Sequence, residues 1–495
     1  MTLQEREAFE RSYGQGAAQV VVRRLVNDIE TPVSAYLKLR RGQPYSFLLE
    51  SVEGGSWRGR YSVLTLDPDV VWRARGNAAE IARGEDVTAG RFSALPGAAL
   101  DTLRALVDDS RMEIPAGLPP MVAGIFGAFG YDMIRLIEPL GAANPDPLGL
   151  PDAVLTRPSV IAVFDGVAQE IILSAPVWPS SDIAAADALA RAHARLDDVE
   201  EALREPAPPM APSTPAPISF EGSVPRARYH EVVARAKDYI AAGDIFQVVP
   251  SQRFSAAFDG DSFAFYRSLR RTNPSPFLFY MDFGDFCLSG SSPEILLRLR
   301  DGELTIRPIA GTRPRGATPE EDRALEADLL ADPKERAEHL MLLDLGRNDV
   351  GRVAEPASVR VTDSFFIERY SHVMHLVSNV TGRVREGVHP VDAILAALPA
   401  GTLSGAPKVR AMQIIDELEG VKRGIGYAGA AGYISAGGEI DTCIILRTAL
   451  FADGMIHVQA GGGVVADSDA DAEYEETLHK SRAIRRAAEE SWRFG

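Results

Sequence analysis

The chain has 495 residues, a formal net charge of −17, and 46% hydrophobic and 24% charged residues. This length exceeds one ordinary hydrophobic core, so two or three domains are expected, and the composition is that of a globular protein. The negative charge argues against binding to nucleic acids or anionic membranes, because both require basic surfaces. An anionic ligand would have to be held by a metal ion or by individual Lys and Arg side chains.

The number of cysteines and the hydropathy of the sequence indicate the cellular compartment that we expect for the protein. Cys287 and Cys443 are the only cysteines, so the sequence indicates neither a disulfide framework nor a zinc–thiolate site and suits a reducing cytoplasm. No apolar run approaches the ~18 residues that span a membrane. The charged N-terminus lacks the apolar core of a signal peptide. We therefore expect a cytoplasmic protein without a membrane partner.

The first half mixes short strands with helices, the first of which is a short polar helix predicted within residues 1 to about 30. The strands are predicted at 20–22, 37–39, 46–51, 60–64, 70–72 and 79–81, with a hairpin at 160–164 and 170–174. The other helices are predicted at 101–109 and 181–204. Gly124, Gly127 and Gly130 interrupt an apolar run, but they lack the order of a GxGxxG nucleotide loop. Close packing is the expected reason for them.

A proline-rich stretch, PAPPMAPSTPAP at 206–217, separates the halves. Such a stretch is stiff, lacks a backbone donor at each Pro and forms no core, so it predicts a linker. We divide the chain into an N-terminal region at 1–204, a linker at 205–223 and a C-terminal region at 224–495.

The C-terminal region alternates strands and helices. Strands are predicted at 245–254, 277–282, 286–289, 294–300, 303–307, 358–362, 372–381, 428–435, 440–451 and 455–459. Helices are predicted at 226–242, 263–272, 391–398, 408–418 and 469–492, and two more begin near Thr318 and Asp332. Long antiparallel strands with helices outside predict an α+β fold of layered antiparallel sheets.

Two acidic stretches carry glutamate pairs three residues apart: Glu335 with Glu338, and Glu473 with Glu476. Residues three apart lie on one face of a helix. Two such helices facing each other would place four carboxylates around one small volume. A divalent cation would balance their repulsion, and all-oxygen ligation suits Mg²⁺.

The same spacing also fits plainer origins. Glu335 can close a capping box that Asp332 begins, and Glu476 can form a surface ion pair with Lys480. Spacing by itself leaves both interpretations open.

Several polar, glycine-rich motifs follow one another in the C-terminal region. They are SGSSPE at 289–294, PIAGTRPRG at 308–316, KERAEHLMLLDLGRND at 334–349, GTLSGAPK at 401–408 and EYEET at 473–477. In this order they resemble the chorismate-utilising enzymes, and most of all the anthranilate synthase large subunits. The resemblance covers residues from about 225 to 485, and LLES at 48–51 extends it into the first half. It implies a catalytic C-terminal region that binds Mg²⁺ through the four glutamates, and an N-terminal regulatory region.

The resemblance also assigns catalytic residues. Glu294 matches the general acid that protonates the departing ring hydroxyl, a role that needs a raised pKa. Its plainer role is a surface Glu at the start of a hairpin. His375 matches the active-site His, whereas His372, three residues earlier, would point to the other face of a strand.

Further positions match the substrate pocket of the family. Arg447 matches a binder of a substrate carboxylate, for which the planar fork of Arg is suited; a strand-end salt bridge is the plainer role. The remaining matches are Thr402, Tyr427, Gly461, Gly462, Gly463 and Lys480.

Two positions distinguish reactions within the family. Relatives that form isochorismate or salicylate carry a Lys base where this chain has Gln247, and Gln is no base near neutral pH. Aminodeoxychorismate synthases carry a nucleophilic Lys where this chain has Ala310. Both differences favour direct attack by ammonia.

The resemblance therefore implies a Mg²⁺-dependent lyase, an oxo-acid-lyase that converts chorismate and ammonia to anthranilate and pyruvate in tryptophan biosynthesis. The chain has no glutaminase cysteine setting, so a separate glutamine amidotransferase subunit is expected to supply the ammonia. The alternatives are an aminodeoxychorismate synthase component I and a catalytically silent, ligand-sensing subunit.

A tryptophan site for feedback inhibition is also implied. Glu50 and Ser51 belong to the LLES motif, whose plainer reading is an edge strand. A second contact loop and a third wall match at Pro274, Ser275, Leu278 (where Met is common), Tyr433 and Cys443.

Overall fold

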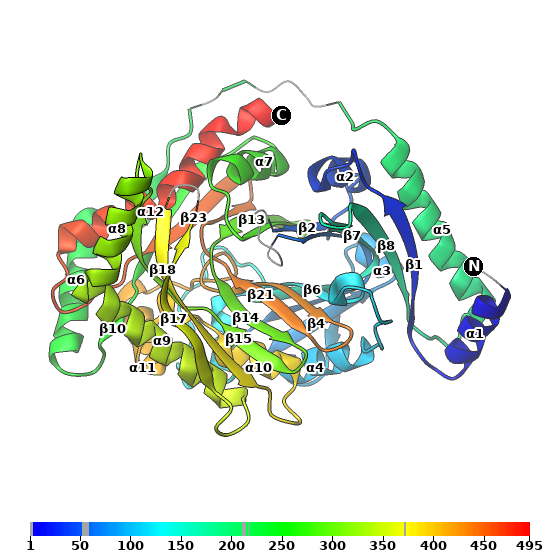
Figure 1. The fold of residues 1–495 in the computed structure, drawn as a ribbon, viewed down its shortest axis with the longest axis horizontal. Coiled ribbons are helices and arrows are strands. Elements are labelled where there is room, and N and C mark those ends of the chain that lie inside the picture. The colour runs from blue at the N-terminus through cyan, green and yellow to red at the C-terminus, as the bar shows by residue number, and fades with distance from the viewer. Residues whose placement is uncertain (1–2, 52–58, 210–213, 216, 371–372) are drawn as a thin grey trace.

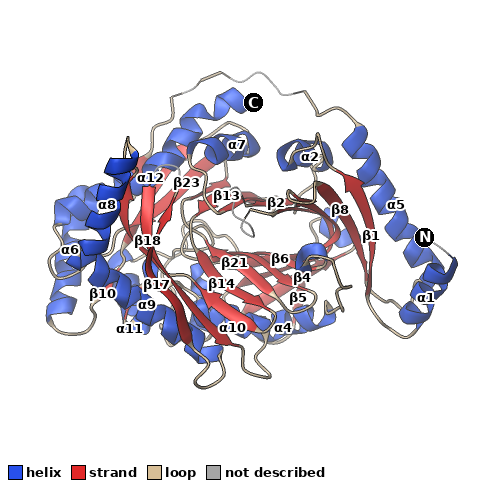
Figure 2. Cartoon of the chain, in the orientation of Figure 1, coloured by secondary structure: helices blue, strands red, loops and turns tan. Residues whose placement is uncertain are grey.

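The computed structural model describes residues 3–51, 59–209, 214–215, 217–370 and 373–495 (Figure 1). Helices cover the outer faces of the sheets (Figure 2). The helices before the linker are α1 (Leu3–Gly14), α2 (Pro32–Leu39), α3 (Glu85–Thr88), α4 (Ala99–Asp109), η1 (Pro120–Val122), η2 (Tyr131–Leu136) and α5 (Ala185–Arg204). Those after it are α6 (Arg226–Ala241), α7 (Ser262–Thr272), α8 (Pro319–Ala331), α9 (Pro333–Val353), α10 (Pro390–Ala397), η3 (Gly401–Leu403), α11 (Lys408–Glu419), α12 (Ala470–Glu490) and η4 (Ser491–Phe494).

Strands form the interior, and every strand pairing in the described residues is antiparallel. The first strands are β1 (Gln19–Val26), β2 (Phe47–Glu50), β3 (Tyr61–Arg75), β4 (Ala78–Arg83), β5 (Ser93–Leu95), β6 (Gly124–Phe129), β7 (Ala153–Asp165), β8 (Glu170–Val177) and β9 (Glu221–Gly222). The middle strands are β10 (Gln247–Val248), β11 (Ser251–Ala257), β12 (Phe277–Asp282), β13 (Phe286–Ser292), β14 (Ile295–Arg300), β15 (Glu303–Ile306) and β16 (Ile309–Pro314). The last are β17 (Arg360–Arg369), β18 (Val373–Arg383), β19 (Gly405–Ala406), β20 (Ala430–Ser435), β21 (Ile440–Ile444), β22 (Thr448–Ala452) and β23 (Met455–Gly461). The predicted α+β class with layered antiparallel sheets is confirmed.

The two halves of the chain share one sheet network. Strand β2 pairs with β12, and β6 pairs with β20, so strands from before and after the linker lie side by side. The three largest hydrophobic cores each contain residues from both halves. Helices α5 and α6, which flank the linker, lie at opposite sides of the molecule (Figure 1). The boundary at 205–223 stays a prediction about the chain, whereas sheet and core are continuous across it.

The predicted reason for the glycines in β6 is confirmed. A Cβ at Gly124 would collide with the Ile434 carbonyl of β20, and one at Gly127 with the Val154 carbonyl of β7. The strand is thus clamped closely between neighbours from the two halves. These glycines belong to sheet packing and not to a nucleotide loop.

Several element predictions differ from the structure. The strand expected at 245–254 is divided into β10 and β11, and those expected at 60–64 and 70–72 are one strand, β3. Two further differences have local reasons. Residues 37–39 were expected as a strand but end helix α2, because Thr31 and Ser34 form a capping box and Pro32 opens the first turn. The single strand expected at 440–451 is divided into β21 and β22. The extended conformation is interrupted at Arg447, which has a φ of 48°.

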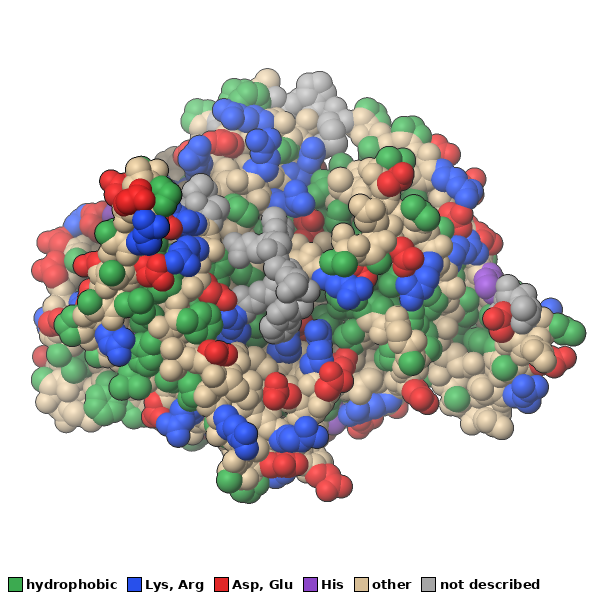
Figure 3. All heavy atoms as spheres, in the orientation of Figure 1, with side chains coloured by type: hydrophobic (Ala, Val, Ile, Leu, Met, Phe, Trp, Pro, Cys, Tyr) green, Lys and Arg blue, Asp and Glu red, His purple; other side chains and the backbone are tan. Residues whose placement is uncertain are grey.

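No helix in the described parts of the chain is both long and apolar enough to cross a membrane. Basic and acidic side chains intermingle over the face drawn in Figure 3. On that face the net charge of −17 does not gather into one extended acidic patch.

Candidate active site

A cavity of about 440 Å³ collects nearly all the predicted catalytic, substrate and metal residues. Its walls come from the turn before β14, from β16, α9, β18, η3, β23 and α12. The predicted residues on its lining are Glu294, Glu335, Glu338, His375, Thr402, Tyr427, Arg447, Gly461, Gly463, Glu473, Glu476 and Lys480. Glu294 and Lys480, 186 residues apart in the chain (480 − 294), therefore meet in one place.

Glu294 is buried at the end of the β13–β14 turn. Its Oε2 accepts a hydrogen bond of 3.2 Å from the Thr402 hydroxyl, which belongs to η3. Burial raises the pKa of Glu294 to about 8, although Thr402, the Ile309 backbone and the charge of Arg447 each act to lower it. A carboxyl group that keeps its proton near neutral pH can serve as a general acid.

His375 faces the cavity from β18 with a defined tautomer. Its Nδ1 lies 3.0 Å from the carbonyl oxygen of Gly311, which can only accept, so Nδ1 carries the proton. Burial lowers the pKa of His375 to about 4. The imidazole is therefore neutral, and its Nε2 is left as an acceptor. His372 lies outside the described residues.

Arg447 occupies the break between β21 and β22. Its positive φ is a conformation that side chains other than Gly seldom adopt, and such strain concentrates at functional sites. Burial lowers the pKa of Arg447, and no ion pair or hydrogen bond of its side chain is found among the described residues. A buried guanidinium without a carboxylate partner is suited to an anionic ligand.

The glycines at the end of β23 and directly after it make room for other cavity residues. A Cβ at Gly461 would lie 3.0 Å from the Tyr427 hydroxyl, and one at Gly462 would lie 2.7 Å from Glu473 Oε2. A Cβ at Gly463 would collide with the Gln247 side chain. Gly462 itself is the one predicted substrate residue absent from the described cavity lining. Its lack of a side chain leaves the space that the Glu473 carboxylate occupies.

The four glutamates line the same cavity but are partly engaged by neighbours. Glu335 lies 3.2 Å from Arg313, Glu476 lies 2.7 Å from Lys480, and Glu473 Oε1 accepts from Ser468 at 2.7 Å. Lys480 also donates to the Gly461 carbonyl at 3.0 Å. Within the described residues, no group of three or more His, Cys, Asp or Glu side chains is arranged to hold a metal ion. The expected convergence of all four carboxylates is therefore not present in this arrangement.

The donor set nevertheless fits an oxygen-ligated cation. Glu473 Oε2 is buried without a hydrogen-bond partner. Burial, reinforced by Glu335, raises the pKa of Glu338, and burial, reinforced by Glu476, raises that of Glu473. Such groups gain most from a nearby positive charge, and carboxylate oxygens are the ligands of Mg²⁺.

Sequence reasoning gave some cavity residues no role and placed others wrongly. Thr312, Lys334 and Gln459 line the cavity and had been given no role. Gln247, which the sequence singled out only as a position that distinguishes reactions, is buried, and its Oε1 has no partner among the described residues. The GTLSGAPK motif leads into the N-terminus of α11, and a helix N-terminus generally favours anions. Its Lys408 is instead buried, and it pairs with Asp349 of α9 at 2.7 Å. That pair joins α9 to α11 and is structural.

A second cavity, of about 570 Å³, contains most of the predicted tryptophan residues. Glu50, Ser51, Leu278, Tyr433 and Cys443 line it, whereas Pro274 and Ser275 do not. The missed lining includes Arg298, Arg300 and Asp441. The cavity lies where β2 of the first half meets β12 of the second.

Glu50 is held more firmly than the sequence suggested. Its Oε2 accepts from the Tyr266 hydroxyl at 2.5 Å and from Arg270 Nε at 3.0 Å, and Arg270 also contacts Oε1 at 3.2 Å. The carboxylate thus fixes the wall of the cavity from α7.

A sequence profile of the chorismate binding enzyme family matches residues 31–486. The chain belongs to this family. The profile spans the proline-rich linker, so the family relationship covers most of the first half as well, where LLES at 48–51 was the motif that had indicated it.

Two members of the chorismate binding enzyme family illustrate the similarity. Anthranilate synthase component 1 of Cereibacter sphaeroides is 58% identical over 492 residues, which cover 99% of this chain and 98% of the relative. Anthranilate synthase component 1 of Pseudomonas aeruginosa is 49% identical over 470 residues, 93% of each chain. This chain therefore matches such proteins over at least 93% of their length.

Solved structures agree with the family fold. Anthranilate synthase component I from Streptococcus pneumoniae superposes with a TM-score of 0.76 at 37% identity, covering 93% of this chain and 99% of that one. The menaquinone-specific isochorismate synthase from Escherichia coli superposes with a TM-score of 0.71 at 19% identity, over 98% and 99% of the two chains. The latter similarity concerns the fold alone.

Proposed function

We propose that this chain is an anthranilate synthase component I, which converts chorismate and ammonia to anthranilate and pyruvate. The observation that carries the proposal is Glu294, a buried carboxyl group with a pKa of about 8 in the cavity that also holds Arg447 and the four glutamates. The similarity to proteins named anthranilate synthase component 1 supports it.

Each role follows from the chemistry of the side chain. Arg447 binds a carboxylate of the substrate, and Glu294 donates its proton to the ring hydroxyl as that group leaves. Loss of the hydroxyl as water completes the addition of ammonia at the ring carbon C2, and elimination of pyruvate with loss of the C2 proton then makes the ring aromatic. The Nε2 of His375 is a hydrogen-bond acceptor on the same cavity wall.

Glu335, Glu338, Glu473 and Glu476 are the residues that would hold Mg²⁺. When bound, this ion would neutralise the ring carboxylate and polarise the ring. Oε1 of Glu335 and Oε1 of Glu476 are paired with Arg313 and Lys480, so the second oxygen of each carboxylate is the one placed to bind the ion without breaking these pairs.

Gln247 and Ala310 support ammonia as the nucleophile. Both line the cavity, and neither can act as a base or form a covalent adduct. We further propose that a glutamine amidotransferase subunit supplies the ammonia and that tryptophan inhibits the enzyme from the second cavity.

The test is incubation of the pure chain with chorismate, Mg²⁺ and ammonium. Anthranilate fluorescence should appear together with an equimolar amount of pyruvate. Formation of aminodeoxychorismate or isochorismate instead would contradict the proposal, and so would a complete lack of turnover. Ala310→Lys should divert product from anthranilate, whereas an unchanged product would show that this position does not select the reaction.

A further inference from the structure

A fully buried ion pair lies directly behind the catalytic cavity. Arg423 and Glu419 approach to 2.6 Å, and their side chains are 1% and 4% exposed. Neither belongs to the described residues that line the cavity. Because a buried ion pair is seldom more stabilising than apolar residues of similar shape, its presence here points to a geometric role.

The guanidinium of Arg423 binds two chain segments besides Glu419. Its Nη1 donates to the Leu403 carbonyl at 2.7 Å, and its Nη2 donates to the Val249 carbonyl at 2.6 Å. It also lies 5.3 Å from the ring centroid of Tyr427. Leu403 and Tyr427 line the cavity, and Val249 follows Gln247 by two residues.

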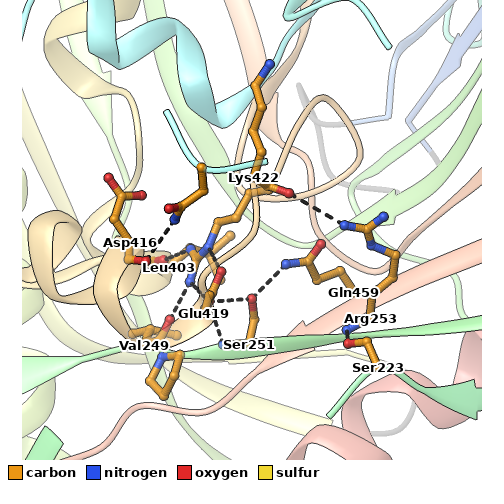
Figure 4. A network of polar contacts seen from close by, with 12 residues as sticks. Ser223, Val249, Ser251, Arg253, Leu403, Asp416, Glu419, Lys422 and Gln459 are labelled. Carbon is orange, nitrogen blue, oxygen red and sulfur yellow. Dashed lines mark hydrogen bonds and ion pairs between the residues drawn. The ribbon is translucent and has the colours of Figure 1, made fainter. Parts of the chain in front are cut away.

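The carboxylate of Glu419 extends the network to β11 and β23. Its Oε1 accepts from both the backbone N–H and the hydroxyl of Ser251 at 2.8 Å. The Ser251 hydroxyl in turn accepts from Gln459 Nε2 at 2.8 Å, as Figure 4 shows. Gln459 lines the cavity two residues before Gly461. Four walls of the cavity are thus tied to one ion pair.

One of these walls carries the partner of the general acid. Thr402 precedes Leu403 in η3, and its hydroxyl donates to Glu294 at 3.2 Å. We propose that Arg423 and Glu419 are positioning residues that hold the Thr402 hydroxyl against Glu294 and keep the β10–β11 and β23 walls in register. This inference rests on the proposed function.

The test replaces the pair by apolar residues, in the double variant Arg423→Met with Glu419→Leu, so that neither charge is left buried alone. The matched control is Arg157→Met with Asp69→Leu. That pair is also bidentate, with both bonds at 2.8 Å, and neither of its members lines either cavity. Both double variants should remain folded by circular dichroism.

Three readouts are expected to change only in the Arg423/Glu419 variant. The kcat should fall about tenfold to hundredfold, as for a displaced catalytic group. The alkaline limb of kcat/KM should move upward, because the carboxylate of Glu294 loses the Thr402 hydrogen bond. Hydrogen–deuterium exchange should accelerate in peptides covering 249–251 and 401–404, where the Ser251 N–H bonds Glu419 and the Val249 N–H bonds the Ser404 carbonyl.

A folded double variant whose kcat, pH profile and exchange match those of the wild type would overturn the positioning role. If the variant does not fold, Ser251→Ala decides, since it removes the Gln459 link and leaves both charges in place. It should lower kcat by about threefold to tenfold, and an unchanged kcat would overturn the inference. A wild-type chain inactive with chorismate and ammonia would contradict the proposed function instead, while the exchange experiment would still test the network.

Discussion

The catalytic cavity and the second cavity differ in how their charged side chains are paired. In the catalytic cavity Glu294 has only a hydroxyl as side-chain partner, and one oxygen of Glu473 has no partner among the described residues. In the second cavity Glu50 is bound by Arg270 and Tyr266, and Asp441 is bound by Arg298 at 3.1 Å. The first cavity thus leaves polar groups for a ligand, whereas the second uses ion pairs to build its wall.

This difference has an energetic consequence. A buried polar or charged group without a partner costs free energy, and such groups concentrate where chemistry is done. Replacing such a group should impair turnover without harming stability. Replacing a residue of the second cavity should leave turnover intact and change only the response to its ligand.

The largest expected effect is that of Glu294→Gln. Gln retains the size and can accept the Thr402 hydrogen bond, but it has no proton to give. The kcat should fall by about 10²–10⁴, the usual contribution of a general acid. Steady-state anthranilate fluorescence measures it, with Glu303→Gln on the exposed surface of β15 as the control. A kcat within tenfold of the wild type would remove Glu294 from its role.

The same variant should be more stable than the wild type above about pH 5. The pKa of Glu294 is raised to about 8 in the folded chain, from 4.5 as its ordinary value. The carboxyl group therefore imposes no penalty below pH 4.5, and the folded state loses relative stability as pH rises from there to about 8. Removing it should gain on the order of a few kcal/mol at pH 8. Urea unfolding of the variant and the wild type at pH 4.5 and pH 8 measures this gain. If the difference in free energy of unfolding between the two proteins were the same at both pH values, burial would not destabilise the ionised form of Glu294.

The metal prediction concerns Glu338→Gln and Glu476→Gln. Each removes one anionic ligand, and each should lower Mg²⁺-dependent turnover by about a hundredfold or more, since second-shell changes alone cost up to that amount. The melting temperature should not fall, because each variant has one negative charge fewer among the neighbouring carboxylates and therefore less repulsion between them. Titration of activity against Mg²⁺ is the measurement. Wild-type activity at low Mg²⁺ in either variant would contradict the assignment.

The sequence motifs predicted which residues line the catalytic cavity better than they predicted the contacts that these residues make. The spacing of Glu335 and Glu338 correctly places both on one face of α9. It carries no information about Arg313, which binds Glu335 from β16, because that contact depends on how β16 and α9 pack. The positive φ at Arg447 likewise arises from the joining of β21 and β22, and the apolar run at 443–446 favours one continuous strand.

The sequence also did not predict that strands from the two halves of the chain pair in the same sheet. Pro206 to Pro217 is a linker by every local criterion, but local composition does not report that β2 and β6 pair with strands from after it. Strand order is a long-range property, and alternation within a strand fixes its two faces without naming its neighbours. Lys408 shows the same limit, since a lysine at a helix start suggests an anion site and its buried partner Asp349 lies 59 residues earlier.

The second cavity should respond to tryptophan without affecting catalysis. Ser51→Phe places a large ring on its lining and should raise the inhibition constant about tenfold to hundredfold, equivalent to about 1.5–3 kcal/mol. Inhibition arises only if tryptophan binds one arrangement of the two halves more tightly than the other. Inhibition curves at saturating chorismate measure the effect, with Ser93→Phe on β5 as a surface control.

Ser51 is a cleaner position for this test than Glu50. Glu50→Ala would leave Arg270 and Tyr266 without their carboxylate and would disturb the packing of α7 on β2. Uninhibited turnover of Ser51→Phe should equal that of the wild type. A wild-type enzyme that is insensitive to millimolar tryptophan, or a Ser51→Phe variant inhibited as before, would exclude this site.

The smallest expected effect is that of Thr402→Val, which removes a single hydrogen bond from Glu294. That bond favours the ionised carboxylate, and with it in place the pKa is about 8. Its loss should raise the pKa, so the alkaline limb of kcat/KM should move upward by about one pH unit. The proton is already on Glu294 at pH 7, and kcat there should therefore change by less than about threefold, whereas the variant should retain more of its maximal activity at pH 9 than the wild type does. Thr305→Val, on β15, is the control. A limb that stays in place or moves downward would mean that the group titrating in this range is not Glu294. The contrast between a catalytic cavity with unpaired polar groups and a second cavity with paired ones would then lose its main support.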